Sequence, residues 1–335
     1  MRYRYLAAYS IPALAGVGLY LGGPFAWLTV PAVYVGVPLA DMLGGRDDRN
    51  FSPATPSPNG PLFFGVLVQF ILLFGFALTW SQEADGLTRL GWIVSVALAC
   101  GGIGIVVAHE LVHRRSLFER LCGKLVLMSV LYMHFAIEHV RGHHVHVGTD
   151  ADPASARLGQ SIYAFLPSSV VRQMVSAWAL EHERLVKEKR ALWSIHNEML
   201  WIAAIQSTWL ACIGFFFGFS FLMAYAAMAV MAFSLLEVVN YVEHYGLRRI
   251  RDAAGRIEPV RARHSWNSDH RVSRALLFEL PRHTDHHMNG MRAYSSLQSV
   301  TGAPQLPAGY PAMVVLALIP PLWFRVMNPR VAALA

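Results

Sequence analysis

The chain has 335 residues, of which 55% are hydrophobic and 15% are charged, and its mean hydropathy is +0.38. Since soluble domains carry roughly 25% charged residues, this composition excludes an ordinary soluble domain and indicates a membrane protein. The formal net charge is +7, and the three cysteines (Cys100, Cys122 and Cys212) are too widely spaced for a disulfide framework or a thiolate metal site. Any metal ion must therefore be held by nitrogen and oxygen ligands.

Apolar runs along the chain predict six transmembrane helices, because a span needs roughly 17 to 25 predominantly apolar residues. Arg2 and Arg4 precede the first run as in a signal peptide, but Gly22-Gly23-Pro24 leads directly into a second run, which predicts a retained helical hairpin. The predicted spans, in chain order, are approximately residues 6–21, 24–40, 61–80, 90–108, 199–217 and 219–242.

Polar segments separate these spans within one predicted domain, residues 1–335. Residues 41–60 are typical of a polar loop, with Pro53, Pro56 and Pro58, whereas the apolar run 311–324 is too short to span and is expected at the interface or packed on the bundle. All of the 28 Lys and Arg residues except Arg89 fall on one predicted side, which the positive-inside rule makes cytoplasmic. The sequence therefore predicts an all-α integral membrane protein with a histidine-rich cytoplasmic cap, residues 109–198 and 244–335, and no nucleic-acid partner.

Four histidine-bearing motifs fall on this predicted cytoplasmic side. Two of them place imidazoles one helical turn apart, in the segments 109–113 and 283–287. The segment 138–144, if α-helical, puts His139 and His143 on one face with His144 beside them, and the segment 240–246 adds a single histidine. The nine candidate metal ligands are His109, His113, His139, His143, His144, His244, His283, His286 and His287.

Nine imidazoles indicate two metal ions rather than one. Taken alone, His109-Glu110-Leu111-Val112-His113 matches the H-E-x-x-H signature of zinc proteases, but a catalytic zinc site uses three protein ligands. Two ions with four or five nitrogens each fit the count, and imidazole suits iron, copper, zinc and nickel alike. Four nearby carboxylates are predicted to accept hydrogen bonds from ligand ring N–H groups and to offset the metal charge; these are Glu110, Glu138, Glu243 and Asp285.

The order of the four motifs resembles that of the membrane alkane 1-monooxygenases, within the wider superfamily of three-histidine-box diiron enzymes. The motifs read His-Glu-x-x-His-Arg-Arg, Glu-His-x-x-x-His-His, Asn-Tyr-x-Glu-His-Tyr-Gly and His-x-x-His-His. The resemblance covers roughly residues 60–330 and extends to Asp152-Pro153-Ala154, Ser161-Ile162-Tyr163, the segment 264–270 and the segment 320–325. Val140 stands where Asn is common in the second motif, which disturbs no ligand.

This resemblance implies a diiron centre held by the nine histidines in a bacterial inner membrane, with the active site on the cytoplasmic side. Such enzymes activate dioxygen with electrons from rubredoxin, itself reduced by an NADH-dependent rubredoxin reductase, and hydroxylate the terminal methyl group of an n-alkane that enters from the bilayer. An acidic electron carrier suggests a basic landing patch, for which the candidates are Arg248, Arg249, Arg251, Arg261 and Arg263.

Three alternatives stay open from the sequence. Methyl-group hydroxylation of an alkylarene, as in xylene monooxygenase, uses the same motif architecture, a fatty acyl desaturase is more distant, and an intramembrane zinc protease belongs to another class. Glycines in the predicted spans, among them Gly101 and Gly102, either permit close helix packing or leave room for a substrate.

Overall fold

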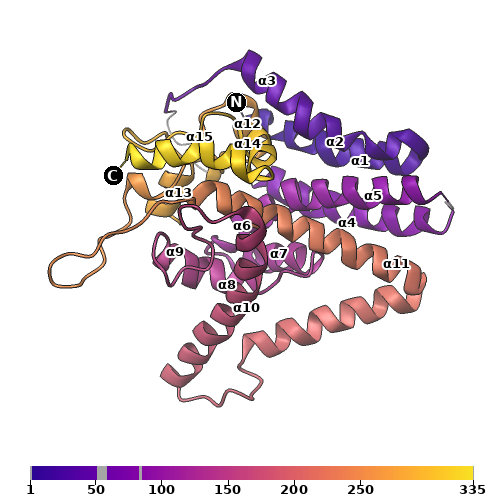
Figure 1. Cartoon of the computed structure of the whole chain (residues 1–335). Helices are drawn as coiled ribbons and strands as arrows, with labels where there is room; N and C mark the ends of the chain where they lie inside the picture. Colours follow the sequence, from indigo (N-terminus) through magenta and orange to yellow (C-terminus); the bar gives the residue numbers. More distant parts are fainter. Residues whose placement is uncertain (1, 51–58, 83–84, 335) are drawn as a thin grey trace.

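The computed structural model describes residues 2–50, 59–82 and 85–334, and within these residues it is helical with no β-strand. Figure 1 shows helices α1 (Ser10–Leu21), α4 (Gly60–Trp80), α5 (Gly86–Ala99) and one limb of α11 (Glu198–His244) running side by side. The histidine-bearing segments gather toward one end of this bundle. The fold is therefore an all-helical membrane bundle with a polar end that carries the candidate site.

The N-terminal segment forms the predicted hairpin. After the 3₁₀-helix η1 (Arg2–Tyr9) and α1, the chain turns at Gly22, whose φ of 64° favours glycine. The return limb consists of η2 (Gly23–Trp27), α2 (Thr29–Pro31), the π-helix η3 (Ala32–Gly36) and α3 (Val37–Gly44). A Cβ on Gly18 would lie 2.7 Å from the Phe25 carbonyl oxygen, so this glycine lets the two limbs approach closely.

The polar loop predicted from residue 41 begins later than expected. Asp41 is a buried residue of α3 because its carboxylate accepts the backbone N–H groups of Val272 and Ser273 at 3.0 and 2.9 Å. It thereby caps the first turn of α12 (Arg271–Leu276). The predicted loop residues Pro53, Pro56 and Pro58 lie outside the described residues.

Two long helical segments deliver histidines to the site. Helix α5 continues through the π-helix η4 (Cys100–Gly104) into α6 (Ile105–Val112), and together they make one apolar helix of 27 residues. Helix α11 is interrupted at Gly218, where φ is 82° and ψ is 168°, and its two limbs fold back on each other (Figure 1). The Trp209 indole donates to the Tyr225 hydroxyl across these limbs at 2.8 Å, so the predicted helical pair 199–217 and 219–242 is present.

The predicted count of six spans is matched only in part. Four of the described helical segments are long and apolar enough to cross a membrane: Gly23–Gly44, Gly60–Trp80, Gly86–Val112 and Glu198–His244. A fifth is added if α14 (Tyr310–Ala317) and α15 (Pro320–Ala332), bent by 119°, count as one span. The first predicted span is divided between η1 and the 12-residue α1, which is too short to cross a bilayer alone at 1.5 Å per residue.

The remaining helices build the polar end, and all of them except the 26-residue α10 are short: α7 (Leu117–Met128), α8 (Phe135–Glu138), the π-helix η5 (His139–His143), α9 (His144–His146), α10 (Ile162–Lys187), η6 (Ala262–His264), α13 (His283–Met288) and η7 (Tyr294–Ser296). The C-terminal pair α14–α15 packs on α11 through Met313, Val314 and Ala317, which share a hydrophobic core with Val238 and Tyr241. The interpretation of residues 311–324 as packed on the bundle is confirmed.

Candidate metal centre

All nine predicted histidines meet in the polar end of the bundle. His109 and His113 come from the end of α6, His244 from the end of α11, and the other six from η5, α9 and α13. Eight of them are buried and His144 is partly buried. They form two adjoining groups, which we call the five-histidine cluster and the four-histidine cluster.

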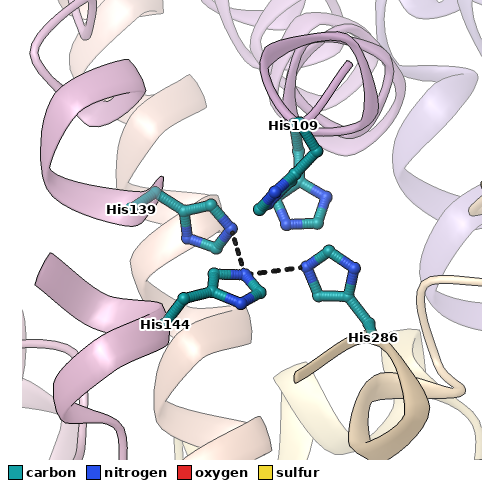
Figure 2. Close-up of side chains that lie close together, drawn as sticks. His109, His139, His144 and His286 are labelled. Carbon is teal, nitrogen blue, oxygen red and sulfur yellow. Dashed lines mark hydrogen bonds between the residues drawn. The ribbon is translucent and has the colours of Figure 1, made fainter. Parts of the chain in front are cut away.

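The five-histidine cluster consists of His109, His113, His139, His144 and His286, each offering one ring nitrogen within 4.8 Å of the others. His144 Nε2 lies 3.1 Å from His139 Nε2 and 3.0 Å from His286 Nε2. Figure 2 shows the rings of His109, His139, His144 and His286 turned toward a common centre from three separate parts of the chain. Segments distant in sequence therefore converge on one point.

The four-histidine cluster consists of His143, His244, His283 and His287. His287 Nε2 lies 3.2 Å from His143 Nε2 and 3.0 Å from His283 Nε2, and His283 Nε2 lies 3.1 Å from His244 Nε2. The same ring nitrogen thus faces the centre in all four residues.

The division of the second motif follows from a π-helix. In η5 the His144 N–H reaches the His139 carbonyl five residues back, so His139 and His144 share the five-histidine cluster. His143 turns to the four-histidine cluster, although its ring stacks on His139 with centroids 5.3 Å apart. The α-helical spacing had suggested that His139 and His143 lie together, whereas the wider helical turn separates them.

These nitrogens are suited to hold cations. Nitrogens bound to one ion at about 2.1 Å lie about 3.0 to 3.4 Å from one another, which matches the observed separations of 3.0 to 3.2 Å. His113 Nε2 is buried without a hydrogen-bond partner. Burial lowers the pKa of His113 to about 3 and that of His139, His144, His283, His286 and His287 well below the ordinary value. Neutral imidazoles keep a lone pair for a metal ion.

Asp152 is a site residue that the sequence reasoning did not select. Its Oδ2 and Oδ1 atoms lie 3.0 and 3.1 Å from His143 Nδ1, and it also accepts the Ser155 hydroxyl at 2.5 Å and the Ala154 N–H at 3.0 Å. Burial alone would lower the pKa of His143, but the Asp152 carboxylate raises it. A carboxylate on the outer nitrogen fixes the orientation of a ligand imidazole. In the sequence, the only indication of a role for Asp152 was that Asp152-Pro153-Ala154 resembles the corresponding segment of the family.

Two of the four predicted carboxylates bind groups other than histidine. Glu110 pairs with Arg114 at 2.8 Å and accepts the Tyr294 N–H at 3.0 Å. Asp285 pairs with Arg292 at 2.7 Å and also accepts the Asn289 amide and the Gln298 N–H, each at 2.9 Å. The described contacts of these carboxylates brace the segments that carry His109 and His286.

The other two predicted carboxylates, Glu138 and Glu243, have different surroundings. Burial, reinforced by the Asp152 charge, raises the pKa of Glu138 to about 8, and its Oε1 accepts the Ser176 hydroxyl at 3.3 Å. Glu243 Oε2 lies 3.2 Å from His283 Nε2, the nitrogen that faces the cluster. Glu243 therefore approaches the ring nitrogen of His283 that faces the other cluster histidines, and not Nδ1 on the opposite side of the ring.

An apolar cavity adjoins both clusters. It is lined by side chains from η3, η4, α6, α11 and α14, including Val33, Tyr34, Leu235 and Val239. His109 and His139 of the five-histidine cluster and His283 of the four-histidine cluster also line it. An apolar molecule held in this cavity would thus contact histidines of both clusters.

An all-helical membrane bundle whose polar end holds two histidine clusters defines a histidine-box membrane protein. The fatty acid desaturase family model matches residues 87–317. The chain is 43% identical to alkane 1-monooxygenase 1 of Pseudomonas aeruginosa, over 92% of this chain and 84% of that protein. It is 39% identical to alkane 1-monooxygenase 2 of Alcanivorax borkumensis, over 99% and 91%, and 30% identical to the xylene/toluene monooxygenase hydroxylase component XylM of Pseudomonas putida, over 95% and 86%. The chain belongs to the alkane 1-monooxygenase family within this histidine-box superfamily.

Proposed function

We propose that the protein hydroxylates the terminal methyl group of n-alkanes with dioxygen, giving 1-alkanols. The observation that carries this proposal is the apolar cavity whose wall includes histidines of both clusters. An alkane has no polar group to recognise, so an apolar cavity that ends on a metal centre is the arrangement its oxidation requires. The names of the relatives from Pseudomonas and Alcanivorax support the same reaction.

The two clusters are proposed to hold two iron ions through the nine histidines. When bound, the iron would supply the redox chemistry that activates dioxygen, which no side chain provides. The protein contributes binding, orientation and the exclusion of water. Asp152 orients His143, while Val33, Tyr34 and Val239 hold an alkyl chain with its methyl group toward the histidines.

Electrons are proposed to come from rubredoxin, reduced by an NADH-dependent rubredoxin reductase. Arg251 and Arg261 are exposed on the proposed landing patch. Arg263 pairs with Glu258 at 2.6 Å and Arg249 donates to its carbonyl at 2.7 Å, so part of the patch is engaged within the chain.

The membrane location is proposed from the distribution of charge. The excess of Lys and Arg on the side of the histidines supports a bacterial inner-membrane protein with its site facing the cytoplasm. One domain with six crossings results if η1 and α1 together form one crossing and each limb of α11 forms another.

A second candidate is methyl-group hydroxylation of alkylarenes, which the similarity to XylM favours. The deciding experiment measures the metal content of the detergent-purified protein and its turnover of octane and of a methylarene with reduced rubredoxin and dioxygen. Two irons per chain with 1-octanol as product would support the proposal, whereas preference for the methylarene would favour the second candidate. Formation of a carbon–carbon double bond would indicate a desaturase, and one tightly bound zinc without dioxygen-dependent product would indicate a protease.

A further inference from the structure

Glu243 differs from the other carboxylates near the clusters in where it points. It is the one carboxylate among the described residues that line the apolar cavity, and its side chain is 2% exposed. Its Oε2 lies 3.2 Å from His283 Nε2, which in turn faces His244 Nε2 at 3.1 Å and His287 Nε2 at 3.0 Å. The carboxylate oxygen is therefore as close to His283 as the neighbouring cluster nitrogens are.

The second oxygen of this carboxylate is held by Tyr310. The Tyr310 hydroxyl donates to Glu243 Oε1 at 2.9 Å, and the tyrosine is 2% exposed and also lines the cavity. A buried carboxylate without hydrogen-bond donors is costly, so this contact decides which way the group turns. With Oε1 fixed by the hydroxyl, Oε2 is left on the side of the four-histidine cluster.

The position of Tyr310 is set by the C-terminal helices. It is the first residue of α14 and is followed by Pro311, a residue favoured at the start of a helix. Met313 and Val314 of α14 pack in one core with Tyr241 and Val242 of α11, the helix that carries Glu243. Packing of α14 on α11 thus places the Tyr310 hydroxyl within hydrogen-bond distance of the Glu243 carboxylate.

We propose that Tyr310 is a positioning residue that holds Glu243 Oε2 as an oxygen donor to a metal ion in the four-histidine cluster. This assignment rests on the proposed metal centre and adds a carboxylate ligand and its support to it. It gives the four-histidine cluster five donor atoms, the number that the other cluster offers with histidines alone. In this assignment the bent pair α14–α15 not only packs on the bundle but also positions Glu243 through Tyr310.

The test compares Tyr310→Phe and Glu243→Gln with a matched control, Tyr241→Phe. Tyr241 is an equally buried tyrosine of α11, but its hydroxyl donates to the Gln160 carbonyl at 2.7 Å, away from the clusters. Each protein is purified in detergent with its iron, and iron content, Mössbauer spectrum, kcat and KM for octane are measured. Tyr310→Phe and Glu243→Gln are expected to alter the spectrum of the same one of two irons, whereas Tyr241→Phe leaves both unchanged.

Loss of a hydrogen bond to a charged group corresponds to about a ten- to hundred-fold effect. We therefore expect Tyr310→Phe to lower kcat by about ten- to hundred-fold with KM within about two-fold, because the substrate cavity keeps its shape. In a Glu243→Gln background the same substitution should add less than about two-fold, since Tyr310 acts through the carboxylate.

An unaltered Mössbauer spectrum in Tyr310→Phe would overturn the inference, as would fully additive losses in the double variant. If Tyr310→Phe does not accumulate, Glu243→Gln decides alone, and a spectrum identical to wild type refutes the oxygen donor. A wild-type protein that binds no iron contradicts the proposed function itself, which separates the two failures.

Discussion

At the scale of single residues, the contact that defines the orientation of His143 is the one between Asp152 and Nδ1, the ring nitrogen that faces away from the four-histidine cluster. Asp152 is fully buried against it, whereas Asp150, two residues earlier, is exposed. Asp152→Asn keeps the shape but weakens the orientation of the imidazole, so we expect metal affinity to fall about 10- to 100-fold. Iron retention across a series of chelator concentrations measures this loss, and Asp150→Asn is the matched control. Equal chelator midpoints for the two variants would argue against a role for Asp152.

The assignment of His286 as a ligand makes a separate prediction. His286 Nε2 faces His144 Nε2 at 3.0 Å within the five-histidine cluster, so His286→Ala removes one donor from that group. We expect alkane hydroxylation to be lost and iron content to fall, while the protein still extracts and elutes as the wild type does. His182→Ala, at an exposed histidine of α10, serves as control. Full activity of His286→Ala would refute the ligand assignment.

At the scale of helices, two adjacent glycines in η4 have different surroundings. A Cβ on Gly101 would lie 2.5 Å from the Ala232 carbonyl oxygen of α11, whereas a Cβ on Gly102 meets only Leu235 Cδ2 at 3.9 Å. The sequence left packing and substrate space as alternatives for such glycines. Both glycines line the cavity, but Gly101 also packs directly against the backbone of α11, whereas a side chain at Gly102 has free space.

This difference predicts opposite results for two substitutions. Gly101→Ala forces backbone against backbone, so we expect a loss of about 1 to 3 kcal/mol in stability, seen as a lower unfolding temperature in detergent. Gly102→Leu fills part of the cavity instead, and we expect it to fold normally but to favour shorter alkanes. Product profiles from octane, decane and dodecane measure this shift. An unchanged profile would place the alkyl chain elsewhere.

The helical elements also show what a sequence does and does not reveal about such a site. The candidate ligands were visible because histidine at helical spacing is rare without a purpose, and all nine do converge. Their division between two clusters was not visible, because a π-helical turn at η5 leaves no periodicity in seven residues. Asp152 was missed because a single carboxylate in a loop forms no spacing pattern with other residues that would indicate its role.

At the scale of the whole molecule, hydropathy located the apolar segments but not how each one is built. The hairpin at Gly218 was predicted from the break between two apolar runs and is present. The run 6–21 looks uniform in composition, yet it is divided between a 3₁₀-helix and a short α-helix. Asp41 was assigned to a loop because its partners, the backbone N–H groups of Val272 and Ser273, lie more than two hundred residues away.

Gathering so many neutral imidazoles in one buried region makes the stability of the metal-free protein depend on pH. His113, with its pKa lowered to about 3, stays unprotonated in the folded state, whereas in the unfolded chain it takes up a proton below about 6.5. Between these values the unfolded state binds more protons, so the free energy of unfolding falls as pH falls, by up to about 1.4 kcal/mol per pH unit for each such histidine. His139, His144, His283, His286 and His287 act in the same direction.

We therefore expect the unfolding temperature of the metal-free protein to drop steeply from pH 7 to pH 5. A bound metal ion raises the whole curve, because it binds the folded state more tightly than the unfolded one. Thermal unfolding in detergent, with and without chelator, measures both effects. A flat curve for the metal-free protein over this range would mean that the histidines are protonated in the folded state.

Glu138 contributes with the opposite sign and supplies an internal check. Its pKa is about 8 in the folded protein, so between about 4.5 and 8 the folded state binds the extra proton and stability rises as pH falls. Glu138→Gln removes this opposing contribution while keeping the shape of the side chain. The decline from pH 7 to pH 5 should then become steeper, by up to about 1.4 kcal/mol per pH unit. A shallower decline would show that Glu138 is ionised in the folded protein and paired with a cation.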